Sequence, residues 1–316
     1  MILETGKKLT FAVGLGLAAS LFPVCTAYAT PVIKHVIVIV MENVDAEKIY
    51  GNKKLAPYIN SELMPKYAHA TDFQDQLSID TLSEPHYIWM EAGTNTFPDY
   101  TFSSDDSVSA ERSTSSTEHL VTQIERSGTL AWMSYQEGMG PETGACPIIG
   151  VGKYAVRHNP FVYFRDVSGS PPDVNNEYCA AHHKPFSALA DDMASGNVAN
   201  YVFITPDLCN DMHDTCGKKN RILAGDTWLK QQMPSIIDWL KQNSGVAFIA
   251  WDEADSAAIM PFLAIGPGVK ENYAGDVYYT HGSILKTVEV IFGLPVLPTV
   301  SDDETLSDLF KEGQFP

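Results

Sequence analysis

Two pairs of oxygen-bearing side chains each follow directly after an apolar run. Glu42 and Asn43 end the first run, and Asp252 and Glu253 end another run far downstream. Oxygen ligands from two separate segments are what a divalent cation with open coordination positions requires. Each pair alone also fits a turn or a cap. Taken together, the four residues predict a site for one divalent metal ion, and Mg²⁺, Ca²⁺, Mn²⁺ and Zn²⁺ are all candidates.

Histidine and serine side chains with possible catalytic roles occur at three further places. His213 lies between acidic neighbours in a loop dense in functional groups, residues 206–216, which makes it a better candidate than an isolated histidine. His281 precedes a helical pattern that begins near Ser283, and a helix N-terminus favours a bound phosphate oxygen. Ser83 stands ahead of another helix-like run, and by pattern alone it is a candidate N-cap.

Buried strands are expected to position these residues. Four continuous apolar runs are typical of strands covered on both faces: residues 34–41, 201–204, 246–251 and 262–265. Helical spacing of apolar residues covers residues 223–242 and 283–292. This alternation predicts an α/β fold in which helices sandwich a mostly parallel central sheet. In such sheets ligands collect at the carboxyl ends of the strands, where the polar clusters lie.

The N-terminal segment has the features of a signal peptide, residues 1–29. Lys7 and Lys8 give a basic start, residues 9–21 are apolar, and Ala27-Tyr28-Ala29 is an acceptable processing site. The apolar run is too short to span a bilayer comfortably, and we predict no transmembrane segment. An uncleaved anchor is the alternative. We expect cleavage after Ala29, a single domain over residues 30–316, and a secreted or periplasmic product.

The cysteines that follow this segment predict two disulfides. They are Cys146, Cys179, Cys209 and Cys216, an even number in an oxidising compartment. Three pairings are possible. We favour Cys209–Cys216, because the short segment between them has the character of a loop, and this leaves Cys146 to pair with Cys179. The smaller disulfide would hold His213 in place.

The charge of the chain limits its partners. The formal net charge is −18, which argues against nucleic acid or an anionic membrane as a partner bound through bulk charge. An acidic enzyme with an anionic substrate needs a local source of positive charge, such as a metal ion or histidines.

The region between Asn95 and Gly152 is where we expect substrate choice to reside. Its first part, residues 95–118, is rich in Ser, Thr and Asp and is predicted to be a long surface excursion and a candidate lid. Four aromatic residues of this region fit either an apolar pocket for a lipid or aromatic leaving group or, more commonly, core packing. They are Tyr100, Phe102, Trp132 and Tyr135.

Short motifs spread over nearly the whole chain after the signal resemble one family. They are HVIVIVMEN (35–43), SEPHY (83–87), PDLCNDMHD (206–214), GDTWL (225–229), WDE (251–253) and HGSILKTVE (281–289). In this order they resemble the bacterial phosphoesterase family that holds secreted acid phosphatases and phospholipases C, relatives of the alkaline phosphatase superfamily. The resemblance implies an alkaline phosphatase-like fold.

The resemblance also implies a role for each matching residue of the metal site. Glu42 and Asn43 correspond to the metal ligands after the first strand, and Asp252 and Glu253 to the second pair of ligands. Ser83 corresponds to the nucleophile of the family, which also touches the metal.

The histidines of the motifs receive roles in the same way. His213 and His281 correspond to histidines that hold the phosphoryl group or assist the leaving group. If they act as cations, activity should peak on the acidic side of neutral pH. The family often carries Asn at the position of His86, so the resemblance assigns His86 no role.

The function implied is that of a secreted, metal-dependent acid phosphatase. It would hydrolyse small phosphate monoesters, with phosphoinositides, other phospholipids and other organic phosphates as candidate substrates. Phospholipase members of the family tend to be longer and to carry C-terminal domains for which this sequence has no counterpart, which favours the phosphatase branch. Two alternatives stay open: a phospholipase C-type phosphodiesterase, and a non-catalytic exported protein that binds a phosphorylated ligand in the same cleft.

Overall fold

The computed structural model describes residues 1–2, 6, 33–78, 80–139, 144–217 and 220–316. The predicted signal peptide falls almost entirely outside the described residues.

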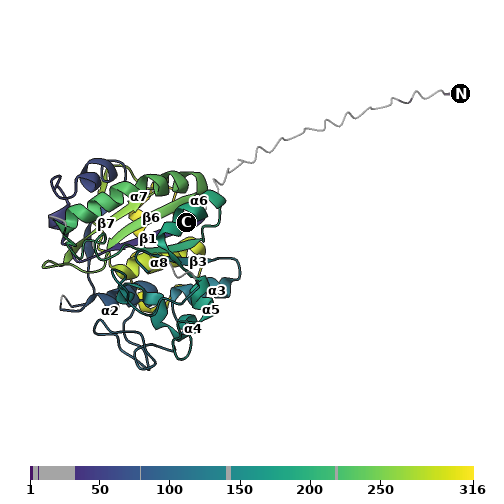
Figure 1. Ribbon diagram of the computed structural model, residues 1–316. Coiled ribbons are helices and arrows are strands. Elements are labelled where there is room, and N and C mark those ends of the chain that lie inside the picture. Colours follow the sequence, from purple (N-terminus) through teal and green to yellow (C-terminus); the bar gives the residue numbers. More distant parts are fainter. Residues whose placement is uncertain (3–5, 7–32, 79, 140–143, 218–219) are drawn as a thin grey trace.

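A central sheet organises the described chain (Figure 1). Its strand order is β4-β3-β5-β1-β6-β7-β2-β8. The strands are β1 (His35–Met41), β2 (Ala68–Gln74), β3 (Trp132–Gln136), β4 (His183–Pro185), β5 (Tyr201–Thr205), β6 (Gly245–Trp251), β7 (Ile259–Ile265) and β8 (Tyr273–Gly275). Strand β7 pairs antiparallel with β6 and β2, and every other pairing is parallel. The predicted, mostly parallel sheet is therefore confirmed.

The strand β7 runs against its neighbours although its sequence resembles theirs. Six of its seven residues are buried, as in the parallel strand β1, and all seven are buried in β6. A continuous apolar run fits a strand covered on both faces and carries no information about its direction. The direction follows from the connection, because the short segment after β6 leads straight back along its edge.

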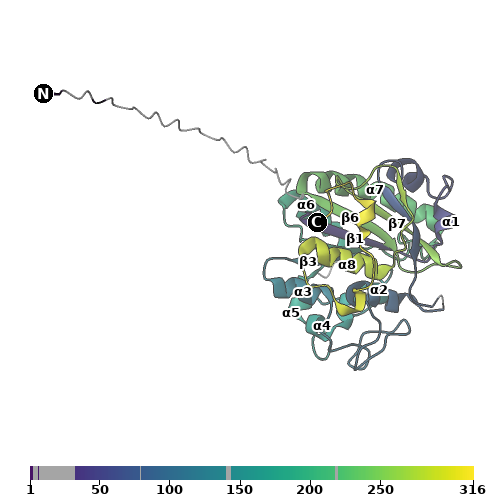
Figure 2. The ribbon, with the colours of Figure 1, turned by 180° about the vertical axis from the view of Figure 1, so that it is seen from behind.

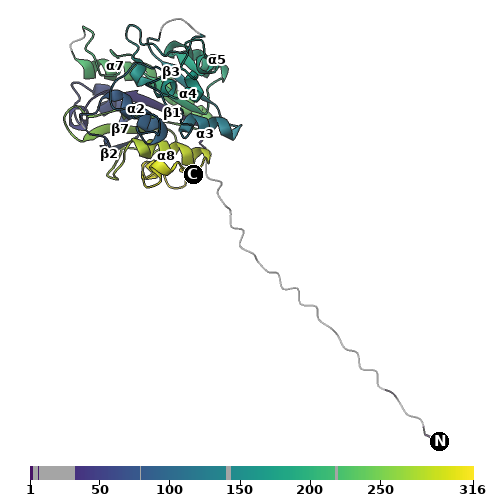
Figure 3. The ribbon, with the colours of Figure 1, turned by 90° about the horizontal axis from the view of Figure 1, so that it is seen from below.

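Helices cover both faces of the sheet. The helices are α1 (Ala46–Ile49), α2 (Ser83–Ala92), α3 (Leu120–Ser127), α4 (Arg165–Ser168), α5 (Glu177–Ala181), α6 (Leu189–Ser195), α7 (Arg221–Asn243) and α8 (His281–Phe292). Helix α7 lies on one face and α8 on the other (Figures 1 and 2). Seen from below, α2 lies beside α8 (Figure 3). The sandwich predicted from the sequence is confirmed.

The two predicted helices begin slightly earlier than their apolar patterns. In α7 the cap is Asn220, whose side-chain oxygen accepts the backbone N–H of Leu223 at 3.1 Å. In α8 a capping box between Thr280 and Ser283 fixes the start of the helix. His281 is consequently the first residue of α8, at the helix N-terminus where the sequence places it.

The core takes up most of the aromatic residues considered as pocket residues. Phe102, Trp132 and Tyr135 are buried, and the Tyr135 hydroxyl donates to Asp192 at 2.6 Å. Tyr100 is partly buried and packs against Phe102. Core packing is therefore their role. The predicted disulfides Cys146–Cys179 and Cys209–Cys216 are both present.

No helix in the described part of the chain has the length and apolarity needed to cross a bilayer.

Candidate functional site

The predicted metal ligands lie at the carboxyl ends of two adjacent central strands. Strands β1 and β6 pair in parallel with Met41 opposite Trp251, so Glu42 and Asp252 both follow the last paired residues. The backbone N–H of Asp252 donates to Met41 O at 3.0 Å and continues this ladder. Parallel pairing thus brings two segments that are far apart in sequence to one edge of the sheet.

Asn43 joins the two ligand pairs. Its side-chain amide donates to Glu253 Oε1 at 2.8 Å, and its backbone N–H donates to Asp252 Oδ1 at 3.2 Å. The backbone of Asn43 has a φ of 33°, a left-handed conformation that asparagine adopts more readily than most residues. Its carbonyl side-chain oxygen, Oδ1, is buried and has no hydrogen-bond partner among the described residues.

Ser83 faces these carboxylates from the start of α2. Its Oγ lies 3.2 Å from Glu42 Oε2 and 3.2 Å from Glu253 Oε1, and the side chain is buried. The prediction that Ser83 is an N-cap is wrong, because Leu82 is the N-cap and Ser83 is the first residue of the helix. A side chain from the 95–118 segment caps the helix instead: Asp105 Oδ1 accepts the backbone N–H of Glu84 at 3.0 Å. The hydroxyl of Ser83 is thereby left for the site.

The donor set fits a divalent cation. Glu42, Asp252 and Glu253 offer oxygen atoms within 4.8 Å of one another, and all three side chains are buried. Burial and then the negative charge of neighbouring carboxylates raise the pKa of Glu42 and that of Asp252. Asp252 Oδ2 is buried without a hydrogen-bond partner in the described chain. A bound cation would satisfy this oxygen and Asn43 Oδ1 and would offset the repulsion.

Three further residues lie beside Glu42 and were not singled out from the sequence: Tyr87, His158 and Asp211. The Tyr87 hydroxyl donates to Glu42 Oε1 at 2.5 Å. His158 Nε2 lies 3.2 Å from the same oxygen, without the alignment of a hydrogen bond, and its Nδ1 lies 3.6 Å from Asp211 Oδ2. Glu42, His158 and Asp211 form a second group with ligand atoms within 4.8 Å. His158 ends a short 3₁₀ turn, Val156–His158, and among the described residues no strand leads directly into this turn to signal a site.

His213 lies at the rim of this cluster. Its backbone N–H donates to Asp211 Oδ1 at 2.7 Å, and its Nδ1 lies 2.9 Å from Asp214 Oδ1. The His213 ring is 6.2 Å from that of His158, and 32% of its side chain is exposed. The disulfide Cys209–Cys216 closes the loop that carries it. The loop therefore presents a solvent-accessible histidine beside buried carboxylates.

His281 and His86 differ in the charge that their surroundings favour. Burial lowers the pKa of His281 to about 4, which disfavours its cationic form near neutral pH. It bonds to the backbone oxygen of Trp251 at 2.9 Å. Burial also disfavours the charged form of His86, but Asp75, at 2.8 Å, outweighs it and raises the pKa of His86. The two rings lie 6.0 Å apart, and His86 is the more readily protonated of the two.

Two charged side chains tie the loops of the site together. Asp45 Oδ1 accepts the backbone N–H groups of three consecutive residues, 255–257, at 2.8 to 2.9 Å. The Arg221 guanidinium donates to the backbone oxygens of Asn43 and Met212, at 2.9 and 2.8 Å. These contacts lock the segment after β1 to the segments after β6 and β5. They hold the two ligand pairs at a fixed distance from each other and involve none of the side-chain oxygens that would bind the metal.

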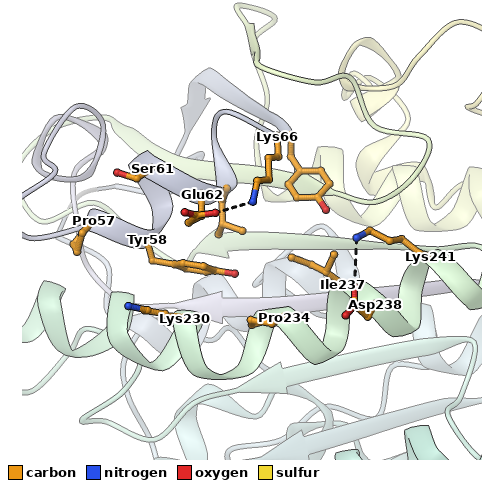
Figure 4. Close-up of a pocket in the computed structure, with 12 residues that line it drawn as sticks. Pro57, Tyr58, Ser61, Glu62, Lys66, Lys230, Pro234, Ile237, Asp238 and Lys241 are labelled. Atoms are coloured by element: carbon orange, nitrogen blue, oxygen red, sulfur yellow. Dashed lines mark hydrogen bonds and ion pairs between the residues drawn. The ribbon is translucent and has the colours of Figure 1, made fainter.

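A pocket of about 560 Å³ lies away from this cluster, between α7 and the π-helical turn Ile59–Leu63 (Figure 4). Tyr58, Lys66 and Lys230 are among its lining residues. None of the residues predicted for the metal site or for catalysis lines it, so its size alone does not make it the active site.

The chain is similar to known proteins along most of its length. A sequence model described as the phosphoesterase family matches residues 62–260. The chain is similar to the phosphatidylinositol-3-phosphatase of Mycobacterium tuberculosis, with 28% identity over 305 residues that cover 94% of this chain and 87% of that protein. It is also similar to the phosphate-repressible acid phosphatase of Penicillium chrysogenum, with 28% identity over 53% of this chain but only 40% of the fungal protein.

A solved structure of the same fold is that of a protein in the alkaline phosphatase superfamily from Vibrio parahaemolyticus. The TM-score is 0.56 with 12% sequence identity, over 87% of this chain and 70% of that chain. At this identity the likeness concerns the fold alone, and it agrees with the alkaline phosphatase-like architecture expected from the motifs.

Proposed function

The chain belongs to the phosphoesterase family and is a hydrolase of phosphoric esters, and from this premise we propose that it is a metal-dependent acid phosphatase. It hydrolyses phosphate monoesters, with Ser83 as the nucleophile. The observation that carries the proposal is the position of the Ser83 hydroxyl, 3.2 Å from each of two buried carboxylates that belong to the candidate metal site. A serine placed only to cap a helix would not face such a cluster.

One divalent metal ion would be held by Glu42, Asn43, Asp252 and Glu253, together with Ser83. When bound, it supplies positive charge that favours the ionised serine hydroxyl and offsets the charge of the phosphoryl group. The residues themselves supply alignment, because the Asp45 and Arg221 contacts fix the loops before any substrate arrives.

The reaction proceeds in two displacements at phosphorus. Ser83 Oγ forms a bond to phosphorus while the bond from phosphorus to the alcohol oxygen breaks, and a carboxylate at 3.2 Å is placed to take the serine proton. Water then attacks the phosphoserine, restores Ser83 and releases phosphate. His213 is accessible to solvent at the rim and is proposed to give a proton to the departing alcohol.

The remaining histidines stabilise the phosphoryl oxygens. His86, whose pKa Asp75 raises, is proposed to supply positive charge near the phosphoryl group, and His281, whose ring contacts Trp251 O and the Gln76 amide, is proposed to act through its position at the start of α8. Acidic pH favours the charged form of His86. We therefore expect an optimum below neutral pH. Export as a single domain over residues 30–316 is part of the proposal, and the two disulfides support it.

Hydrolysis of p-nitrophenyl phosphate from pH 4 to 9 tests the proposal, with chelated protein and with Mg²⁺, Ca²⁺, Mn²⁺ or Zn²⁺ added back. Ser83→Ala is expected to lower kcat at least about 10³-fold. The exposed Ser61→Ala serves as the matched control and should retain wild-type activity. A Ser83→Ala enzyme that keeps a tenth of the activity would remove Ser83 as the nucleophile. Turnover of p-nitrophenyl phosphorylcholine without turnover of the monoester would instead establish the diesterase.

A further inference from the structure

Residues 104–106 hold the first turn of α2 through two reciprocal hydrogen bonds. Asp105 Oδ1 accepts the backbone N–H of Glu84 at 3.0 Å, and Glu84 Oε2 accepts the backbone N–H of Asp106 at 2.7 Å. A capping box exchanges side-chain and backbone groups in the same way, but between two positions of one helix start. Here the partners are 21 and 22 residues apart in sequence. The first turn of α2 is therefore held from outside the helix.

Residues 104–106 are in turn fixed to the rest of the fold through Asp106. The buried Tyr163 donates its hydroxyl hydrogen to Asp106 O at 2.7 Å, and Ser104 Oγ donates to Asp106 Oδ2 at 2.9 Å. These contacts involve none of the proposed metal ligands. They fix the backbone on which Asp105 stands, so the position of its carboxylate is set independently of the metal.

Asp105 also joins two segments that meet at Glu42. Its Oδ2 lies 3.1 Å from Arg157 Nε, and the next residue along the chain, His158, lies 3.2 Å from Glu42. On the other side, the helix turn that Asp105 caps begins with Ser83, whose Oγ lies 3.2 Å from Glu42 Oε2. One carboxylate outside the proposed metal ligands therefore contacts both of these segments.

We propose that Asp105 is a positioning residue, which holds the Ser83 hydroxyl against the carboxylates of the metal site by capping the first turn of α2. This inference rests on the phosphatase function proposed above. The N-cap residue itself, Leu82, makes no capping bond with its side chain. Loss of Asp105 would remove the acceptor of the Glu84 N–H and free the first turn to fray. A misplacement of about 1 Å at a reacting group can lower a rate about 10²-fold.

Kinetics on p-nitrophenyl phosphate, measured beside titration of the metal-free protein with the ion that supports turnover, test the role of Asp105. Asp105→Ala removes the cap and should lower kcat about 10- to 100-fold, with KM within about threefold of wild type. The Kd of the ion should also stay within about threefold, because the pairing of β1 with β6 sets the ligand pairs. Asp105→Asn keeps an oxygen that can accept the Glu84 N–H, and kcat should return to within about fivefold of wild type.

Asp99→Ala is the matched control from the same part of the chain. Asp99 also accepts a backbone N–H, that of Ser115 at 2.8 Å, and also lies beside an arginine, Arg165 at 3.6 Å. The exposed fractions of the two aspartate side chains are similar, 28% for Asp105 and 31% for Asp99. Because these contacts of Asp99 do not involve α2, Asp99→Ala should keep kcat within about twofold of wild type. A loss of kcat as large as that in Asp105→Ala would overturn the proposal.

Two further results would contradict the positioning role: wild-type kcat in Asp105→Ala, or an Asp105→Asn enzyme as slow as Asp105→Ala. A Kd for the ion that rises as much as kcat falls would also overturn it, because Asp105 would then act on the metal site. Circular dichroism identifies the folded variants. Asp105→Leu fills a similar volume without an acceptor, should show the same loss of kcat, and decides the question if Asp105→Ala does not fold. Failure of the phosphatase function itself would appear differently, as no hydrolysis of p-nitrophenyl phosphate by the wild type.

Discussion

Each end of helix α2 lies beside a cluster of histidine and carboxylate side chains, and the two clusters differ in how completely their polar atoms are paired. At its C-terminal end, His119 lies between Glu91, at 2.9 Å, and Asp166, at 3.1 Å, and its ring stacks on Phe164. The backbone N–H of Val121 also donates to the Glu91 carboxylate, at 2.7 Å. At the N-terminal end, around Ser83, carboxylates outnumber the charged partners available.

The difference separates a structural cluster from the cluster that we propose to be functional. The His119 cluster has one cation between two anions, and the atoms that face one another are paired. In the Ser83 cluster, Asp252 Oδ2, Asp211 Oδ2 and Asn43 Oδ1 have no hydrogen-bond partner within the described residues. Buried polar groups left unpaired cost stability and persist where a ligand or a reaction needs them. The Ser83 cluster holds more acids, and its unpaired polar atoms are what distinguishes the two ends.

Removing the cation of the paired cluster should have the largest effect on stability. His119→Ala leaves Glu91 buried beside Asp166 without a compensating charge and should lower the free energy of unfolding by about 3–5 kcal/mol. Urea unfolding measures the change, and kcat at a temperature where the variant is folded should stay near wild type. His182→Ala is the matched control, because its ion pair with Glu125 is partly exposed and should contribute at most about 1 kcal/mol. Equal losses in the two variants would contradict the structural role of His119.

Metal binding should stabilise the unpaired cluster. A divalent ion at about one hundred times its Kd should raise the free energy of unfolding of chelated protein by about 2.7 kcal/mol. Asp252→Asn should lose most of this gain, because a metal ligand and a negative charge are removed. His119→Ala should keep it. Differential scanning calorimetry with and without the ion measures the shift, and the same shift in Asp252→Asn as in wild type would place the ion elsewhere.

The smallest expected effect is a dependence of stability on pH at the His119 cluster. Burial disfavours the charged imidazole, but Asp166 and Glu91 raise the pKa of His119 to about 9, above its ordinary value of about 6.5. A raised pKa contributes stability that is fully present below pH 6.5 and is lost as the pH rises through 9. The difference between wild type and His119→Ala should therefore shrink by about 1 kcal/mol between pH 7 and pH 8. Urea unfolding at several pH values measures it, and a difference that grows with pH would reverse the assignment.

The sequence predicted those features of the site that depend on local patterns. Apolar runs that end in polar residues located the ends of β1 and β6, and the structure brings Glu42, Asn43, Asp252 and Glu253 together there. The spacing of the cysteines gave the disulfide pairing, since a segment as short as Cys209–Cys216 closes readily on itself. These features need little knowledge of the rest of the fold.

Features that depend on tertiary contact were not predictable in this way. His158 approaches Glu42 only because a 3₁₀ turn packs behind α2, and nothing in the sequence around it marks a site. The cap of α2 comes from Asp105 and not from Ser83, since a distant carboxylate can replace a local cap. The pKa shifts of His281 and His86 could not be predicted either, because they depend on burial and on the contact between His86 and Asp75.

The position of β1 in the middle of the sheet also bears on how the protein is made. Strand β1 is the first strand of the chain, yet Val36 pairs with Tyr201 on one side and Val246 on the other. During synthesis this apolar strand must therefore wait, with both edges open, until most of the chain has emerged. Contacts of such long range slow folding and expose unpaired strands to aggregation. We therefore expect the yield of active enzyme to depend on how well β1 is kept from aggregating before β5 and β6 are made.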